Sequence, residues 1–295
     1  MTLILSAVAG DYAVQVSDRR LTQGNGVLSD ETNKAVLFCG RSAFAYTGLA
    51  KMGNVPMDEW LTRALVNART QSLSDAVHSV AQQATVGFQK IRYSRKVKRH
   101  AFVGVGWTQL RNETFVSPII CSVSNALDEN GNWLDEARDE FSIKYTIGPG
   151  QPCFNVVSYG QTLPAKDLSQ LRRKIRKCFE RKTGPEPIVK YLTNEILRIA
   201  GRNSKVGKSL MVVCLPKKTA LSTPQFLLTD MGPTAPMTLK EMPSFYYLAR
   251  SGAGKIRFAP NTACGGQGFR NVELERLNDS GRDASIQATI VLPQS

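Results

Sequence analysis

Two pairs of apolar segments near the start of the chain predict two β-hairpins. Gly10-Asp11 separates the first pair and Gly40-Arg41 the second, and both dipeptides are typical of tight turns. The four predicted strands are residues 3–9, 12–21, 34–39 and 42–47. Because these strands are apolar at nearly every position, we expect both faces of each hairpin to be covered.

Apolar residues at helical spacing predict the next elements. A helical region should begin at Pro56 and run to about residue 94 with an interruption near 71–74, and two helices should follow at 165–181 and 186–200. Further strands are predicted at residues 101–110, 115–126, 140–147, 209–215 and 226–229 and in the terminal segment SIQATIVLP. The order of strands, helices, strands, helices and strands indicates an α+β fold, with sheets packed together and helices outside.

The length and composition fit a large globular core with an appendage. The chain has 295 residues, of which 42% are hydrophobic. We expect a core domain at residues 1–232 and a loop- and strand-rich extension at 233–295. No apolar run reaches the roughly 18–20 residues of a membrane span, and the first residues lack the pattern of a secretory signal. These features predict a cytoplasmic protein that does not associate with membranes.

The cysteines and histidines indicate neither a metal site nor a cofactor. The six cysteines are scattered and form no CxxC pair, so we expect reduced thiols rather than disulfides or metal ligands. The only histidines, His78 and His100, leave little material for a zinc site or a histidine-based triad.

The net charge of +14 raises the question of an acidic partner. Basic clusters occupy residues 90–100 and 172–182, and either could bind phosphate backbones or an acidic protein. In the second cluster, however, Leu171, Ile175 and Phe179 recur at helical spacing. This spacing favours the solvated face of an amphipathic helix over a nucleic-acid site.

Thr2 is the first candidate for chemistry. If an aminopeptidase removes Met1, Thr2 carries both a hydroxyl and a free α-amine. A threonine hydroxyl alone is a poor nucleophile, but an α-amine with a pKa of about 7.7–8.0 can serve as its base.

Hairpin pairing predicts which residues lie near Thr2. If residue 9 pairs with residue 12, Thr2 lies beside Asp18. If residue 39 pairs with residue 42, Lys34 lies opposite Thr47 and beside Gly48. Adjacent, antiparallel placement of the two hairpins in one sheet would then gather these residues.

Each gathered residue type has a chemical role. The Thr2 hydroxyl would attack a carbonyl, and the Lys34 cation would favour its alkoxide-like form. Asp18 would hold Lys34 in place. The backbone N–H of Gly48 would donate to the tetrahedral oxyanion, and Arg20 would brace the terminus or Asp18.

These residues stand at the spacing of a known family. Thr2, the run from Ser17 to Arg20, Lys34 and the turn Thr47-Gly48 resemble proteasome-type N-terminal-nucleophile hydrolases, the threonine peptidases of proteasome β subunits and their bacterial relatives. The resemblance is strongest over residues 2–50 and continues weakly to about residue 216.

The resemblance implies a fold, an activity and an assembly. The fold is a four-layer αββα sandwich of two antiparallel sheets flanked by helices. The activity is threonine-type hydrolysis of a peptide or protein substrate, without a cofactor. The assembly is a homo-oligomeric ring or stack, and a partner ATPase remains an open possibility.

The second half of the chain departs from the family pattern. Gly148-Pro149-Gly150 stands where the family has Gly-Ser-Gly, and the segment from Asn203 to Val206 stands where it has Asp-x-x-Ser. Asn203 keeps a hydrogen-bonding group there, but not a negative charge. Two alternatives therefore stay open: a narrower amidase of the same mechanism, and an inactive member of the fold that binds nucleic acid or an acidic partner.

Overall fold

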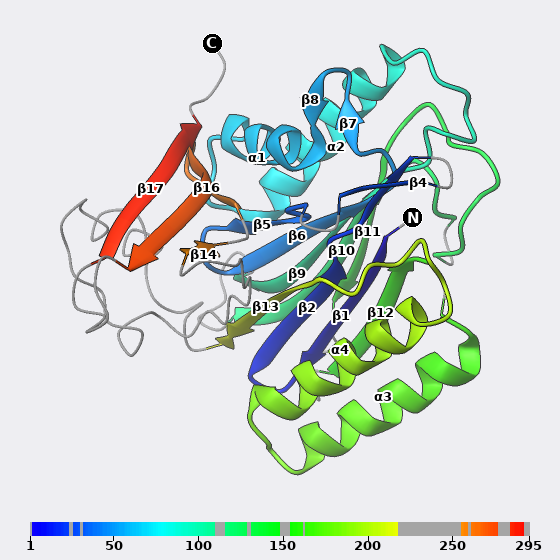
Figure 1. Cartoon of the computed structure of the whole chain (residues 1–295), viewed down its shortest axis with the longest axis vertical. Helices are drawn as coiled ribbons and strands as arrows, with labels where there is room; N and C mark the ends of the chain where they lie inside the picture. The colour runs from blue at the N-terminus through cyan, green and yellow to red at the C-terminus, as the bar shows by residue number, and fades with distance from the viewer. Residues whose placement is uncertain are drawn as a thin grey trace.

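The computed structural model has an α+β fold with several mainly antiparallel sheets and, among the described residues, four helices (Figure 1). It describes residues 2–23, 26–29, 32–109, 116–128, 131–147, 154–161, 163–217, 255–258, 261–276 and 284–291. None of the helices in these ranges is long and apolar enough to cross a membrane.

The smaller of the two main sheets contains the first hairpin. Its four strands are all antiparallel, and their order is β12 (Phe154–Gly160), β1 (Leu3–Ala9), β2 (Tyr12–Asp18) and β13 (Leu210–Pro216). β1 is buried along its whole length, as its unbroken apolar sequence requires.

The larger sheet contains the second hairpin. Its order is β11 (Ser142–Ile147), β10 (Val116–Ser124), β9 (Ala101–Gln109), β6 (Ser42–Thr47), β5 (Ala35–Phe38), β15 (Asn261–Cys264), β16 (Gln267–Arg276) and β14 (Lys255–Phe258), and β17 (Ala284–Val291) pairs with β16. The ladder between β5 and β15 is parallel, whereas an entirely antiparallel sheet was expected. Two small hairpins, β3 (Leu21–Gln23) with β4 (Gly26–Ser29) and β7 (Lys51–Met52) with β8 (Val55–Pro56), lie outside the main sheets.

Each main sheet is covered by its own pair of helices. α1 (Met57–Asn67) and α2 (Leu73–Gln89) pack on the larger sheet, and α3 (Ala165–Glu180) and α4 (Pro185–Ala200) pack on the smaller sheet (Figure 1). Sequence signals fix the helix starts: Ser72 caps α2 by accepting the Asp75 N–H, and α4 begins with a proline.

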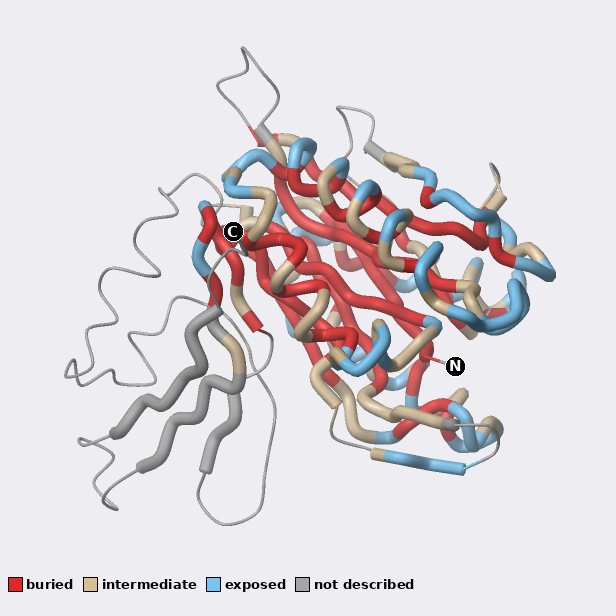
Figure 2. The backbone as a smooth tube through the Cα atoms, turned by 90° about the horizontal axis from the view of Figure 1, so that it is seen from above, coloured by how far each residue is buried: buried red, intermediate tan, exposed pale blue. Residues whose placement is uncertain are grey.

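A further apolar cluster lies between the two sheets. It joins residues of β1, β2 and β13 to residues of β5, β6, β9 and β10. Two buried hydrogen bonds also cross between the sheets: Gln15 Nε2 donates to Val103 O at 3.1 Å, and Trp107 Nε1 donates to Leu215 O at 2.9 Å. The central strands β1, β5 and β6 are therefore buried on both faces, while the outer helix faces are exposed (Figure 2).

The first hairpin has the predicted register and the second does not. Ala9 pairs with Tyr12, as expected. In the second hairpin Phe38 pairs with Ser42, so the connection has three residues instead of two and the predicted pairing of Lys34 with Thr47 is wrong by one position. The cause is local, because Cys39 and Gly40 both adopt positive φ, at 49° and 64°.

The predicted placement of the two hairpins in one sheet is also wrong. They lie in two different sheets that pack face to face. Both hairpins are apolar on both faces, and that pattern cannot distinguish neighbours within one sheet from partners across an interface. The site residues nevertheless converge, because β1 and β5 begin at the same end of the two packed sheets, where Thr2 contacts Lys34.

Part of the described C-terminal segment belongs to the larger sheet. β15 adds to the larger sheet beside β5, and a disulfide joins Cys39 to Cys264, whose Cα atoms are 4.6 Å apart. The expectation of reduced thiols throughout is therefore wrong for this pair. Asn261 Nδ2 also donates to Thr62 Oγ1 on α1 at 3.1 Å.

Other predicted elements agree or lie outside the described residues. The order of the main strands and helices is confirmed up to β13, although β12 and the small hairpins β3–β4 and β7–β8 were not predicted. The predicted strand at 226–229, the proposed domain boundary at 232/233 and the segment Gly148-Pro149-Gly150 fall outside the described residues.

Candidate functional site

Lys34 is the centre of a buried polar cluster. Its side chain is completely buried, and its ammonium lies 2.7 Å from Thr2 Oγ1 and 3.3 Å from Asp18 Oδ1. It also donates to the carbonyl oxygen of Arg20. A buried cation is stable only when such acceptors replace its water, so the cluster holds the ammonium against the Thr2 hydroxyl.

Asp18 organises the backbone around Thr2 as well as pairing with Lys34. Its Oδ2 accepts the N–H of Leu3 at 2.7 Å, directly beside Thr2. Its Oδ1 accepts the N–H of Arg20 at 3.0 Å and that of Gly207 at 3.3 Å. One carboxylate at the end of β2 therefore links three chain segments.

The carbonyl of Thr2 is fixed from the opposite side by the end of β12. Gln161 N donates to Thr2 O at 2.9 Å, and Thr47 Oγ1 lies 3.5 Å from the same oxygen. Gly160 adopts φ +85°, and a Cβ at this position would lie 1.8 Å from Thr2 O. Only glycine fits this approach, so Gly160 helps to set the position of Thr2.

Gly48 lies against a wall of backbone and a buried imidazole. Its φ is +120°, and a Cβ would meet Arg99 O at 2.4 Å and His100 Nδ1 at 2.6 Å. No described residue accepts a hydrogen bond from the Gly48 N–H. This donor is therefore available to a bound ligand.

His100 supports this turn from behind. Its Nδ1 accepts the N–H of Leu49 at 3.0 Å, and burial lowers the pKa of His100 to about 3. The ring is therefore neutral at physiological pH, with its proton on Nε2 because Nδ1 accepts. Tyr46 stacks on the ring, with centroids 6.0 Å apart.

Arg20 and Asn203 support the cluster from a distance. Arg20 Nη1 donates to Ser204 O at 2.7 Å, so this side-chain contact braces the turn before β13, whereas the expected partner was the terminus or Asp18. Asn203 Oδ1 accepts the N–H of Lys205 at 3.0 Å, so its described contact shapes the turn that carries Gly207. Val206 is buried in the apolar cluster of α3 and α4.

Ser17 is buried in β2, where its backbone pairs with Ile4 and Met211. Its neighbour Asp18 ends the strand and reaches the cluster. The structure thus brings together Thr2, Asp18, Lys34, Thr47 and the backbone of Arg20, with Gly48 lining the same pocket.

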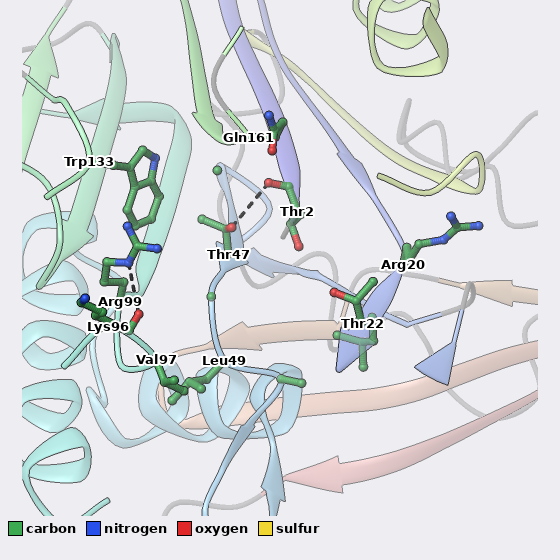
Figure 3. Close-up of a pocket in the computed structure, with 14 residues that line it drawn as sticks. Thr2, Arg20, Thr22, Thr47, Leu49, Lys96, Val97, Arg99, Trp133 and Gln161 are labelled. Carbon is green, nitrogen blue, oxygen red and sulfur yellow. Dashed lines mark hydrogen bonds between the residues drawn. The ribbon is translucent and has the colours of Figure 1, made fainter. Parts of the chain in front are cut away.

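A pocket of about 440 Å³ opens over Thr2 (Figure 3). Thr2, Thr47, Gly48 and Gly160 line one part of it. The rest is lined mainly by β3, the turn after β6, the segment before β9 and the turn that holds Trp133; the lining residues there are Arg20, Leu21, Thr22, Leu49, Ala50, Lys96, Val97, Arg99, Trp133 and Gln161. The Thr2 hydroxyl is therefore next to a space that can hold a ligand.

Sequence reasoning missed Gly160, Gln161 and His100. The segment FNVVSYG before Gln161 has the composition of a strand and ends in glycine. It could have predicted the strand that became β12. His100 gave no local signal, because its role depends on the turn at Leu49, which is distant in sequence.

A comparison with models of known protein families and a comparison with curated protein sequences both found no match to this chain. Across the described ranges, no three His, Cys, Asp or Glu side chains form a group that could hold a metal ion.

Proposed function

We propose that the protein is a threonine-type hydrolase of peptide or amide bonds, with Thr2 as its N-terminal nucleophile once Met1 is removed. The observation that carries the proposal is the 2.7 Å contact between the buried Lys34 ammonium and Thr2 Oγ1, beside an open pocket. The buried ammonium therefore contacts a hydroxyl that a ligand in the pocket can reach.

The reaction begins when Thr2 Oγ attacks the carbonyl carbon of a bound substrate. The hydroxyl proton passes to the α-amine of Thr2, directly or through a water. Lys34 stabilises the developing negative charge on Oγ, and Asp18 balances the charge of Lys34. The amine of the substrate then leaves with a proton, and water hydrolyses the ester formed with Thr2.

The tetrahedral intermediate carries a negative oxygen that needs a donor. The Gly48 N–H fits this role, because it has no partner among the described residues and lines the pocket with Thr2. Loss of one such donor typically costs about 3–4 kcal/mol in transition-state stabilisation.

The packing supports the wider family proposal. Helices on the outside of each sheet and an apolar cluster between the sheets fit the four-layer αββα sandwich of N-terminal-nucleophile hydrolases. By the same resemblance we propose that the chain assembles into a homo-oligomer.

Two measurements test the proposal. The Thr2 nitrogen is acylated as long as Met1 is present, so intact-mass analysis of the purified protein should show a chain that begins at Thr2. A β-lactone or epoxyketone directed at N-terminal threonines should then label Thr2. Thr2→Ser should retain labelling and Thr2→Ala should lose it; complete retention of Met1, or equal labelling of Thr2→Ala, contradicts the proposal.

The alternative of an inactive binding module rests on a different surface. On α3 the buried residues are Leu171, Ile175 and Cys178, and most of the intervening positions are exposed arginines and lysines. This is the arrangement of a solvated amphipathic face. If the face bound duplex DNA, the affinity would fall steeply with salt, and absence of binding at low salt would dismiss the alternative.

A further inference from the structure

The charged side chains that line the pocket over Thr2 are positive in the described part of the chain. Among the described residues that line it, Arg20, Lys96 and Arg99 are basic and none is acidic. Such a pocket attracts anionic groups and disfavours cationic ones, most strongly where solvent is partly excluded.

Arg99 is the best placed of these cations. Its backbone carbonyl is the atom that a Cβ on Gly48 would strike, so the residue adjoins the proposed oxyanion donor. Its Nε donates to Lys96 O at 3.1 Å (Figure 3), and its Nη1 donates to Leu134 O at 3.0 Å. These two contacts hold the guanidinium in place without using all of its five N–H donors.

No carboxylate in the described ranges forms an ion pair with the Arg99 guanidinium. Arg99 and Lys96 form no ion pair there, whereas Arg95, which does not line the pocket, pairs with Asp139 at 2.8 Å. A half-buried, fixed arginine with unused donors is suited to bind a carboxylate.

The rest of the wall suits the stem of an acidic side chain. Leu49, Val97 and Trp133 line the same pocket and supply apolar surface near the cations. Methylene groups of a ligand can pack there while the carboxylate reaches Arg99.

We infer that this pocket selects peptides with a glutamate or aspartate next to the scissile bond, with Arg99 as the specificity-determining residue and Lys96 as a second cation at the exposed rim. The inference rests on the proposed hydrolase function for the placement of the scissile bond, but the binding preference can be measured without turnover.

The test is an equilibrium binding experiment on Thr2→Ala, which has no nucleophile. Two fluorescent peptides, capped at both ends so that neither has a terminal charge, differ only in Glu against Gln. We expect the Glu peptide to bind about 10- to 100-fold more tightly, the range of a charge-assisted hydrogen bond. The preference should shrink as salt is added.

Variants in the same background assign the preference to the pocket. Arg99→Gln should remove most of it and Lys96→Gln part of it. Arg92→Gln removes one exposed positive charge outside the pocket and should leave the preference unchanged. Because Lys96 is exposed, its variant keeps the test valid even if Arg99→Gln folds poorly.

The outcomes separate this inference from the hydrolase proposal. Equal affinity for the two peptides, or no binding of either, overturns the acidic subsite, and so does an effect of Arg92→Gln as large as that of Arg99→Gln. A charge preference without β-lactone labelling of the wild-type protein supports the subsite and contradicts the hydrolase. Labelling without a charge preference supports the hydrolase and contradicts the acidic subsite.

Discussion

The ammonium nitrogen of Lys34 lies 2.7 Å from the hydroxyl oxygen of Thr2, although the two residues stand before strands of different sheets. The contact therefore forms only when the two sheets pack together. Because the pair sits where the sheets meet, the polar cluster contributes to the fold as well as to the proposed chemistry.

Lys34→Ala should abolish labelling of Thr2 and destabilise the protein. It leaves the Asp18 carboxylate buried without its cation, and breaking a buried pair typically costs about 3–5 kcal/mol. Denaturant unfolding measures the loss. The double variant Asp18→Asn with Lys34→Met removes both charges, so it should recover part of the stability and none of the labelling. Full labelling of Lys34→Ala would contradict the site.

Gly48→Ala should reduce the rate more than it reduces stability. The added Cβ would lie 2.4 Å from Arg99 O, so the turn must shift and carry its N–H away from the pocket. We expect kcat to fall by about 10²–10³-fold, as for loss of an oxyanion donor. Gly53→Ala is the matched control, because Gly53 also has positive φ but has no atom within 4 Å of its Cβ position. Equal kinetic effects of the two substitutions would remove Gly48 from the mechanism.

Most residues of the candidate site could be named from the sequence, but their geometry could not. Thr2, Asp18, Lys34 and Gly48 were found because hairpin turns place strand ends at defined offsets, and a shift of one residue in the second hairpin did not move Lys34 out of reach. The sheet that each hairpin joins depends on long-range packing, so the pattern of apolar residues could not reveal it.

The supporting residues were less predictable for the same reason. Gly160 matters because β12 lies beside β1, and His100 matters because its ring meets the turn at Leu49. Both relationships join residues more than fifty positions apart. The segment FNVVSYG predicts a strand but not its partner β1, and His100 has no local signal. The pairing of Cys39 with Cys264 is a third case, since 225 residues separate the two thiols.

Gly160→Ala should disturb Thr2 without touching any charged group. A Cβ would lie 1.8 Å from Thr2 O, so the end of β1 or of β12 must move. We expect loss of most β-lactone labelling together with a clear fall in melting temperature. Gly131→Ala provides a comparison, because Gly131 also has positive φ and its nearest potential contact is the flexible end of Lys144 at 3.5 Å. Normal labelling of Gly160→Ala would show that the position of the Thr2 carbonyl is not critical.

His100 should make stability depend on pH. Burial lowers its pKa in the folded state to about 3, below the ordinary value of 6.5, so the unfolded chain binds a proton more readily. The stabilisation is complete above pH 6.5 and is lost as the pH falls from there towards 3, at up to about 1.4 kcal/mol per pH unit. Urea unfolding at several pH values measures the free energy of unfolding. This free energy should depend less steeply on pH in His100→Gln than in the wild-type protein. Carboxylates titrate in both proteins, so the difference between the two curves isolates the histidine, and identical slopes would contradict the assignment.

Reduction of the disulfide between Cys39 and Cys264 should destabilise the protein by loosening the C-terminal strands from the core. The bond closes a loop across 225 residues, and the chain-entropy model gives an upper limit of about 5 kcal/mol for such a loop. Wild-type protein should therefore unfold at lower denaturant concentration after reduction. Cys264→Ser should unfold identically with and without reductant, while Cys178→Ser, which removes a free buried thiol, should retain the response.

Peptide mapping without reductant identifies the bond directly. If Cys39 and Cys264 both react with a thiol reagent in denatured, unreduced protein, the bond is absent, and the attachment of β15 then depends on its pairing with β5 and on the contacts of Asn261 with α1.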